Sequence, residues 1–233
     1  MRIDIITLFP EMCERVIDES ITGQARRAGI IDIRCHNLRD YSDDKRRRVD
    51  DYPYGGGQGM LIRAEPVARC FEAICRQTTT RPLFIYMSPL GKVFDQQTAV
   101  ELSQIENICL LCGHYEGVDE RVLDTLVDRQ ISIGDFVLTG GELPALAVTD
   151  AVSRMIPGVL SEKVSFEDES HFSGLLEYPQ YTRPPVWRDI PVPEVLRSGH
   201  AKNIADWKHQ QSLERTARLR PDMLKNSGNN IIE

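Results

Sequence analysis

The sequence predicts an α/β domain built on a parallel β-sheet, followed by a small helical domain at the C-terminus. Three observations predict it. Short apolar runs alternate with segments of helical spacing over the first two thirds of the 233 residues. This alternation stops at Pro157, and six of the 13 prolines lie between residues 157 and 193. A basic segment of helical character then runs from His200 to Leu219. We therefore expect domains at 1–160 and 176–233, joined by a linker at 161–175.

The expected strands are short apolar runs of the kind found in buried parallel sheets. They are Ile3–Phe9, Ile30–Ile33, Leu83–Met87, Ile108–Cys112 and Ile131–Leu138. The expected helices lie between or after these runs and are Pro10–Ala28, Ala64–Arg76, Asp95–Ile105, Val118–Val127 and Glu142–Ile156. Pro10 suits the first turn of a helix and Gly29 suits its end. Strands that alternate with helices predict a parallel sheet covered on both faces.

The charge of the chain is distributed unevenly. There are 28 Lys and Arg against 35 Asp and Glu, a formal net charge of −7, which by itself argues against a polyanionic partner. Residues 180–233 nevertheless hold nine basic and six acidic side chains, so the balance of −10 belongs to residues 1–179. A basic appendage on an acidic domain fits either polyanion binding or an ordinary solvated helix face.

The apolar segments also bear on the compartment. The longest uninterrupted apolar run is about five residues, far too short for a transmembrane helix. The N-terminus lacks the pattern of a signal peptide, so we expect a cytoplasmic protein with reduced cysteines and no membrane association.

Cys109 and Cys112 form a C-x-x-C pattern, which in an exposed turn would suggest redox or zinc chemistry. This pair lies in an apolar run, which favours a buried strand, and we predict no metal cage.

A glycine-rich run occupies residues 54–60, with the sequence YGGGQGM. It contains G-x-G-x-G, but it follows the polar segment 46–53 instead of an apolar strand, as a dinucleotide site would require. Four glycines in five residues favour a loop that a ligand can approach closely. With the basic cluster 45–48 just upstream, the ligand that we expect is a nucleic-acid backbone, and the alternative is a flexible surface loop.

Three further turns lie at the carboxyl ends of neighbouring expected strands. They are the segments 88–91 (SPLG), 111–117 (LCGHYEG) and 132–142 (SIGDFVLTGGE). Ligands of open α/β sheets bind at this edge, and backbone groups of such loops suit adenine and ribose. The three turns therefore outline one pocket, unless they are generic connections between strands and helices.

These residues carry a resemblance to a known family. The matching segments are 8–12 (LFPEM), 49–60 (VDDYPYGGGQGM), 88–91, 112–122 (CGHYEGVDERV), 132–145 (SIGDFVLTGGELPA), 152–160 (VSRMIPGVL), 174–184 (GLLEYPQYTRP) and 195–200 (VLRSGH). Together they resemble the bacterial tRNA (guanine-N1)-methyltransferases of the SPOUT superfamily, in order and over nearly the whole chain.

The resemblance implies a fold and a reaction. Members of this family bind S-adenosyl-L-methionine in a deep trefoil-knotted α/β domain, and they are homodimers. Each active site lies between the cofactor pocket of one subunit and the C-terminal domain of the other. The implied reaction methylates N1 of the guanosine at tRNA position 37, 3′ to the anticodon, where another guanosine precedes it. This modification maintains the reading frame.

By motif match, the resemblance also assigns a cofactor pocket. Its expected residues are Tyr86, Ser88, Pro89, Gly113, Tyr115, Glu116, Ser132, Ile133, Gly134, Asp135, Phe136, Val137, Leu138, Gly140, Gly141 and Pro144. The family often has Tyr where this chain has Phe136, a change that removes a hydroxyl and keeps the ring.

The chemistry of the substrate requires a base and a cation. Guanine N1 must lose a proton before it attacks the methyl group, and negative charge then develops on O6. Arg154 matches the family arginine, although without the family it would suggest a helix-face salt bridge. Ungapped alignment places Glu169 where the family has Asp, and Asp168 takes that position if the linker slips by one residue. Family enzymes also use Mg²⁺, for which Glu116 is a candidate contact.

The anticodon loop of tRNA is the expected RNA partner, because RNA is read mostly at unpaired loops. The candidate RNA contacts are Asp50, Gly55, Gly56, Gly57, Gly59, Arg183, Lys202, Lys208 and Arg215. Two other hypotheses remain: a SPOUT enzyme acting on rRNA or another tRNA position, and a non-catalytic RNA-binding protein. Asp50 with its glycine loop and the EYPQYTRP segment argue against the first, and the intact pocket motifs argue against the second. The Glu-for-Asp departure leaves the second open.

Overall fold

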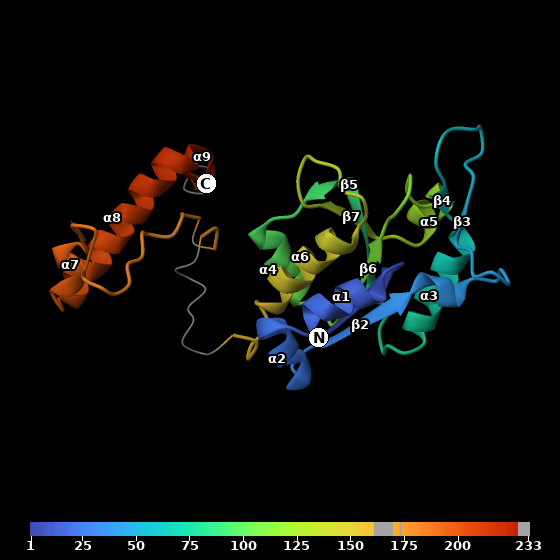
Figure 1. Cartoon of the computed structure of the whole chain (residues 1–233), viewed down its shortest axis with the longest axis horizontal. Coiled ribbons are helices and arrows are strands. Elements are labelled where there is room, and N and C mark those ends of the chain that lie inside the picture. Colours follow the sequence, from blue (N-terminus) through green and yellow to red (C-terminus); the bar gives the residue numbers. More distant parts are fainter. Residues whose placement is uncertain (161–169, 173, 228–233) are drawn as a thin grey trace, which may run out of the picture. The chain divides into compact units, whose positions relative to one another are not determined.

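The computed structural model describes residues 1–160, 170–172 and 174–227 of the chain. The chain divides into two compact units, Met1–Glu162 and Lys163–Glu233, and each is described by itself. Figure 1 shows the strands in the first unit that form a central sheet, with helices packed around it.

The central sheet of the first unit has five strands, and every pair in it is parallel. The strands are β1 (Arg2–Thr7), β2 (Asp32–Asn37), β5 (Leu83–Val93), β6 (Asn107–Cys112) and β7 (Arg129–Ser132), in the spatial order β2-β1-β6-β5-β7. The predicted mixed α/β fold with a parallel sheet is therefore confirmed. All residues of β1 and β6 are buried, which explains why both are rich in apolar residues, although β1 also buries Arg2, Asp4 and Thr7.

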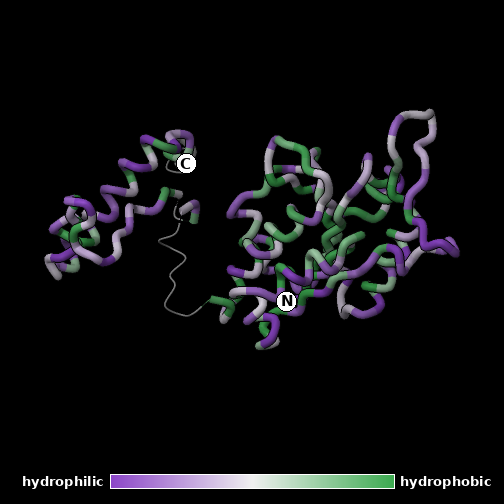
Figure 2. The backbone as a smooth tube through the Cα atoms, viewed as in Figure 1, coloured by the Kyte–Doolittle hydropathy of each residue, from purple (hydrophilic) through white to green (hydrophobic). Residues whose placement is uncertain are grey.

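Helices cover both faces of this sheet, and the strands supply alternate side chains to the two cores (Figure 1). On one face lie α1 (Pro10–Ile17), α2 (Ser20–Arg27), α4 (Gln96–Ser103) and α6 (Glu142–Ser153). On the other lie α3 (Ala64–Cys75), α5 (Glu120–Thr125) and the 3₁₀ turn η1 (Leu38–Tyr41). Figure 2 shows hydrophobic residues concentrated in the strands between these layers.

Several of the predicted elements are wrong in extent. The expected strand Ile30–Ile33 is Asp32–Asn37, and the expected strand Leu83–Met87 continues to Val93. The expected helix Pro10–Ala28 is two helices, because Glu19 between them has an extended backbone (φ −95°, ψ 163°) and Ser20, where α2 begins, has φ 53°. The expected strand Ile131–Leu138 ends at Ser132. Beyond it, Gly134 has φ 151° and its N–H donates to Ser132 Oγ (3.1 Å), so the segment leaves the sheet as a loop.

A short antiparallel pair, β3 (Asp50–Asp51) and β4 (Leu61–Ile62), holds the glycine-rich loop between its strands. Gly55, Gly56 and Gly57 all have positive φ, a conformation that glycine adopts without strain. Figure 2 shows this loop as a mostly hydrophilic excursion from the first unit. The glycine-rich run is therefore the loop of a β-hairpin and not the strand-to-helix turn of a dinucleotide-binding motif.

The second unit contains a small hairpin and three helices within its described residues. The hairpin pairs β8 (Val186–Trp187) with β9 (Ile190–Pro191). The helices are α7 (Glu194–Arg197), α8 (Ala201–Leu219) and α9 (Pro221–Ser227). The basic helix expected at His200–Leu219 is confirmed as α8, whereas the hairpin and α7 are too short to produce a periodic pattern. No helix in the described part of the chain is long and apolar enough to cross a membrane.

Candidate functional site

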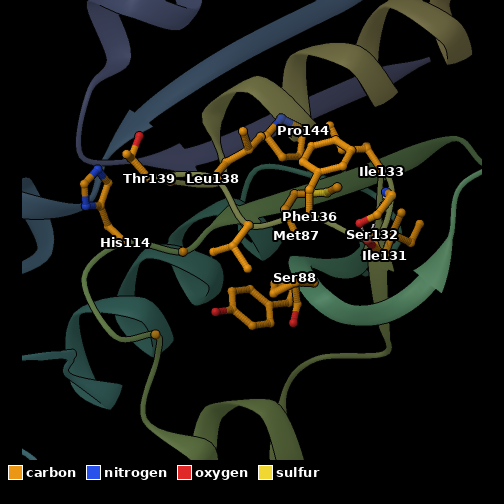
Figure 3. Close-up of a pocket in the computed structure, with 18 of the residues that line it drawn as sticks. Met87, Ser88, His114, Ile131, Ser132, Ile133, Phe136, Leu138, Thr139 and Pro144 are labelled. Carbon is orange, nitrogen blue, oxygen red and sulfur yellow. Dashed lines mark hydrogen bonds between the residues drawn. The ribbon is translucent and has the colours of Figure 1, made fainter.

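A cleft of about 240 Å³ opens at the carboxyl ends of β5, β6 and β7, the edge of a parallel sheet where ligands bind. It is lined by Tyr86, Met87, Ser88, Pro89, Gly113, His114, Tyr115, Glu116, Gly117, Ile131, Ser132, Ile133, Gly134, Phe136, Val137, Leu138, Thr139, Gly140, Gly141 and Pro144. Figure 3 shows His114 and Thr139 at one end of this cleft and Ile131 and Ser132 at the other, with Phe136 and Pro144 side by side along one wall.

The structure brings together all but one of the residues that the sequence assigns to a cofactor pocket. Asp135 is the exception, since it does not line the cleft. Sequence reasoning missed Met87, His114, Gly117, Ile131 and Thr139. Each of these five residues is next to an assigned residue in the sequence, so their place in the same strands and turns could have identified them.

Two glycines allow the loop after β7 to pass directly against the end of β6. Gly141 donates its N–H to Gly113 O (2.8 Å), and a Cβ on Gly141 would lie only 2.7 Å from Cys112 Cα. A Cβ on Gly113 would lie 2.7 Å from Tyr86 Oη. The cleft therefore has a wall of backbone at these positions, which a ligand can approach closely.

A short turn fixes the other end of the loop. Ser132 Oγ donates to Gly134 O (2.9 Å) and accepts from Gly134 N–H, which holds the chain as it leaves β7. Beyond this turn, Phe136 is 53% and Val137 81% exposed. These apolar side chains belong to the rim of the cleft, and they explain why an apolar run here is not a core strand.

The charge of the cleft is negative. Apart from two tyrosines, the ionisable side chains that line the cleft are Glu116 and His114. The lining residues all lie in the described part of the chain, and no Lys or Arg is among them. Burial raises the pKa of Tyr86, so its hydroxyl remains protonated and available as a donor. An arrangement without cations is poorly suited to a phosphate-bearing ligand.

The glycine-rich loop adjoins the cleft through Glu116. Glu116 N–H donates to Met60 O (3.0 Å), and Ile62 N–H donates to Gly117 O (2.9 Å). A Cβ on Gly59 would collide with the Glu116 side chain. The structure thus brings Gly59 to the cleft, whereas Gly55 and Gly56 lie in open space.

The proposed catalytic residues are placed only in part. Arg154 caps the C-terminus of α6, donates its N–H to Asp150 O (3.1 Å), and is half-buried. It does not line the cleft within one chain. Glu169 and Asp168 lie outside the described residues, so their assignment stays a prediction.

The basic residues assigned to RNA lie on separate parts of the second unit. Arg183 and Arg197 line an exposed hollow of about 750 Å³ together with Tyr181, and no acidic side chain lines it among the described residues. Lys208 Nζ lies 4.4 Å from the centre of the Tyr178 ring. Lys202 is exposed, whereas Arg215 Nη1 donates to a backbone carbonyl at 3.4 Å.

The C-x-x-C pair is buried, as expected. Cys109 and Cys112 belong to β6 and contribute to opposite cores, on opposite faces of the sheet. Burial raises the pKa of both thiols, so neither is a ready nucleophile or metal ligand. Among the described residues, no group of three or more His, Cys, Asp or Glu side chains is arranged to hold a metal ion.

Together, the parallel sheet and the cleft at its carboxyl edge define an α/β protein with a small-ligand site next to a glycine-rich loop. The chain matches the family model described as tRNA (Guanine-1)-methyltransferase TrmD over residues 1–226. A tRNA (guanine-N(1)-)-methyltransferase from Ruminiclostridium cellulolyticum is 55% identical over 223 residues, which cover 96% of each chain. A protein of the same name from Lachnospira eligens is 52% identical, covering 96% of this chain and 94% of its own. This chain belongs to the tRNA (guanine-N1)-methyltransferase family.

Proposed function

We propose that this protein transfers a methyl group from S-adenosyl-L-methionine to N1 of the guanosine at position 37 of tRNA. The observation that carries the proposal is family membership over nearly the whole chain, with relatives such as one 55% identical that are named tRNA (guanine-N(1)-)-methyltransferase. The methyl donor and position 37 are what membership of the family implies. The cleft supports it independently, because it offers a site for the methyl donor beside a loop suited to RNA.

The residues of the cleft fit S-adenosylmethionine. This donor carries no phosphate and has a sulfonium cation, which matches a site with carboxylates nearby and no lining Lys or Arg. Phe136, Leu138 and Pro144 supply apolar surface for a flat adenine ring, and the glycines at 140 and 141 let a ligand approach the main chain closely. When bound, the donor supplies an electrophilic methyl group.

The protein's own side chains then act on the guanine. A carboxylate, Glu169 or alternatively Asp168, accepts the proton from N1 as general base. The Arg154 guanidinium stabilises the negative charge that develops on O6. In the structure the N-terminal end of α6 borders the cleft, whereas Arg154 caps its C-terminal end, about 18 Å further along the helix axis. The role of Arg154 therefore rests on the match to the family, and within the proposed dimer it belongs to the part of the site that a second subunit completes.

The proposed assembly is a homodimer, in which the C-terminal domain of one subunit completes the site of the other. It is supported by apolar side chains on the outer side of the α1 and α6 layer. Met12 is 42%, Val16 53% and Leu143 52% exposed in the single chain. A second copy that covers these side chains would remove them from water, which is a common reason for such a patch.

The proposed trefoil knot is supported by the path of the chain after β7. Residues 133–141 pass against the end of β6, where Gly140 and His114 form a bridge, before α6 begins.

Mg²⁺ belongs to the proposal through the family alone. Glu116 is the carboxylate that lines the cleft, and a largely hydrated ion with this single contact fits the absence of a wider ligand set among the described residues.

The proposed RNA surface combines the glycine-rich loop of the first unit with the second unit. Gly59 lies against Glu116 of the cleft, and Asp50 pairs with Ile62 in the hairpin that carries the same loop. Both are proposed to contact the guanosine and its neighbour. The hollow that contains Arg183, Arg197 and Tyr181 offers cations and an aromatic ring to phosphate and base.

One assay tests the function. The protein is incubated with labelled S-adenosylmethionine and with tRNA transcripts that carry guanosine or adenosine at position 37. We expect label only in the guanosine transcript, at N1. Equal labelling of both transcripts would indicate another target position, and absence of labelling with intact tRNA binding would indicate a non-catalytic RNA-binding protein. Either outcome would refute the proposal.

A further inference from the structure

A buried carboxylate lies directly behind the cleft. Glu142 is the first residue of α6 and only 4% exposed. Its Oε1 accepts a hydrogen bond of 2.8 Å from Thr7 Oγ1, at the end of β1. Thr7 is itself 1% exposed and accepts a 2.9 Å hydrogen bond from Phe9 N–H. The position of this carboxylate is therefore set by a contact between two elements far apart in the sequence.

The Glu142 carboxylate lies against two residues that line the cleft, Gly140 and His114. A Cβ on Gly140 would collide with Glu142 Oε2 and would lie 2.9 Å from Cδ2 of His114. Glycine at position 140 therefore leaves room for the carboxylate immediately behind the wall of the cleft.

The charge of Glu142 is not neutralised by a cation in the described part of the chain. Among the described residues, Thr7 donates a hydrogen bond to the Glu142 side chain, and no Lys or Arg forms an ion pair with it. The Glu142 charge is the second cause, after burial, that raises the pKa of Cys112, the last residue of β6. A buried charge without a partner is costly, and a cationic ligand would remove that cost.

We infer that Glu142 makes the cleft discriminate by charge, so that it binds the sulfonium S-adenosylmethionine more tightly than the thioether S-adenosylhomocysteine. The inference rests on the proposed function. Methyl transfer breaks the carbon–sulfur bond and leaves its electron pair on sulfur, which makes the sulfur of the product neutral. The attraction to Glu142 is therefore present for the donor and absent for the product, and this difference favours exchange of product for fresh donor.

Titration calorimetry with three ligands tests the inference. The ligands are S-adenosylmethionine, S-adenosylhomocysteine and an analogue in which a carbon bearing a protonated amine replaces the sulfonium. Glu142→Gln keeps an acceptor for Thr7 and removes only the charge. We expect this variant to bind both cationic ligands about fivefold more weakly than the wild-type protein does, because the lost charge lies several ångströms from the ligand in partly screened surroundings. Its affinity for S-adenosylhomocysteine should stay within about twofold of the wild-type affinity.

Thr7→Val is the matched control, because it removes the hydrogen bond and keeps the carboxylate charge. It should change the affinity for all three ligands by the same factor. Equal losses for all three ligands in Glu142→Gln, or no loss, would overturn the inference and leave Glu142 with a structural role. If Glu142→Gln does not fold, Glu142→Asp decides: it should preserve the preference for the cations, and loss of the preference would overturn the inference. Failure of the wild-type protein to bind any of the three would instead refute the proposed function.

Discussion

Gly141→Ala should damage both the stability of the first unit and its donor site. Gly141 has φ −84° and ψ −2°, which alanine adopts freely, so the cost of the substitution is steric. The new Cβ would lie 2.7 Å from Cys112 Cα and 2.8 Å from Gly113 N, about 1 Å inside ordinary contact distance. Both neighbours are backbone atoms of the central sheet and the turn after it, and neither can rotate away.

The magnitude follows from these contacts. Overpacking of this kind costs about 1–3 kcal/mol, and loss of the 2.8 Å Gly141 N–H to Gly113 O bond adds about 1 kcal/mol. We expect the melting temperature to fall by roughly 5–12 °C, for a unit of this size. Because the loop forms a wall of the cleft, S-adenosylmethionine should bind at least about tenfold more weakly, which corresponds to ~1.4 kcal/mol.

The assay compares thermal unfolding and calorimetric binding of Gly141→Ala with those of Gly29→Ala. A Cβ on Gly29 meets nothing within 4 Å, and that substitution is disfavoured only by a φ of 70°. The control should lose about 1 kcal/mol of stability and should bind the donor normally. If the two variants have the same melting temperature and donor affinity, the close approach of the loop to β6 is not what builds the cleft.

Three further predictions concern catalysis, acid stability and RNA binding. Arg154→Ala should reduce turnover by about 100-fold or more with donor affinity within twofold, measured by single-turnover kinetics and calorimetry; loss of donor binding would show that Arg154 is misassigned. In the same kinetics, Glu169→Gln should be more damaging than Asp168→Asn, and the reverse order would select Asp168. Burial pushes the pKa of Asp4 up, but hydrogen bonds from His36 and Arg2 outweigh it, so the folded-state pKa is lowered. Asp4 thus contributes stability above its unfolded pKa of about 4 that is lost as the pH falls, and urea titrations should show a flatter acid limb in Asp4→Asn. Raising salt from about 50 to 200 mM should weaken tRNA binding at least tenfold and leave donor binding unchanged, and a flat response of tRNA binding would contradict phosphate contacts by the second unit.

The sequence predicted most of the sheet because burial on both faces leaves a local record. The run at Ile108 is apolar throughout and the run at Ile3 is mostly so, since every residue of β1 and β6 is buried. The run at Ile131 led to a wrong strand prediction, because it is also apolar although part of it is not buried. Its apolar residues Phe136 and Val137 form the rim of a cleft, and periodicity alone does not distinguish a ligand site from a core.

The pocket could be predicted as a set of motifs, because the ends of parallel strands meet at one edge of a sheet whatever the loops do. The glycine-rich loop was predicted from its four glycines in five residues, but this composition did not show that Gly59 packs against Glu116. That contact depends on the β3–β4 hairpin, whose strands of two residues are too short for a sequence pattern to reveal.

By itself, then, the sequence determined the fold class, the family and the residues that gather at the sheet edge, because each leaves a local pattern or a motif. Only the tertiary structure decided that Glu142 is buried behind Gly140. Its carboxylate is held by Thr7, 135 positions away in the chain, and no spacing along the sequence records such a contact. A charged residue at the start of a helix normally faces water. Here the packing of α6 against β1 removes it from water and turns it toward the ligand cleft.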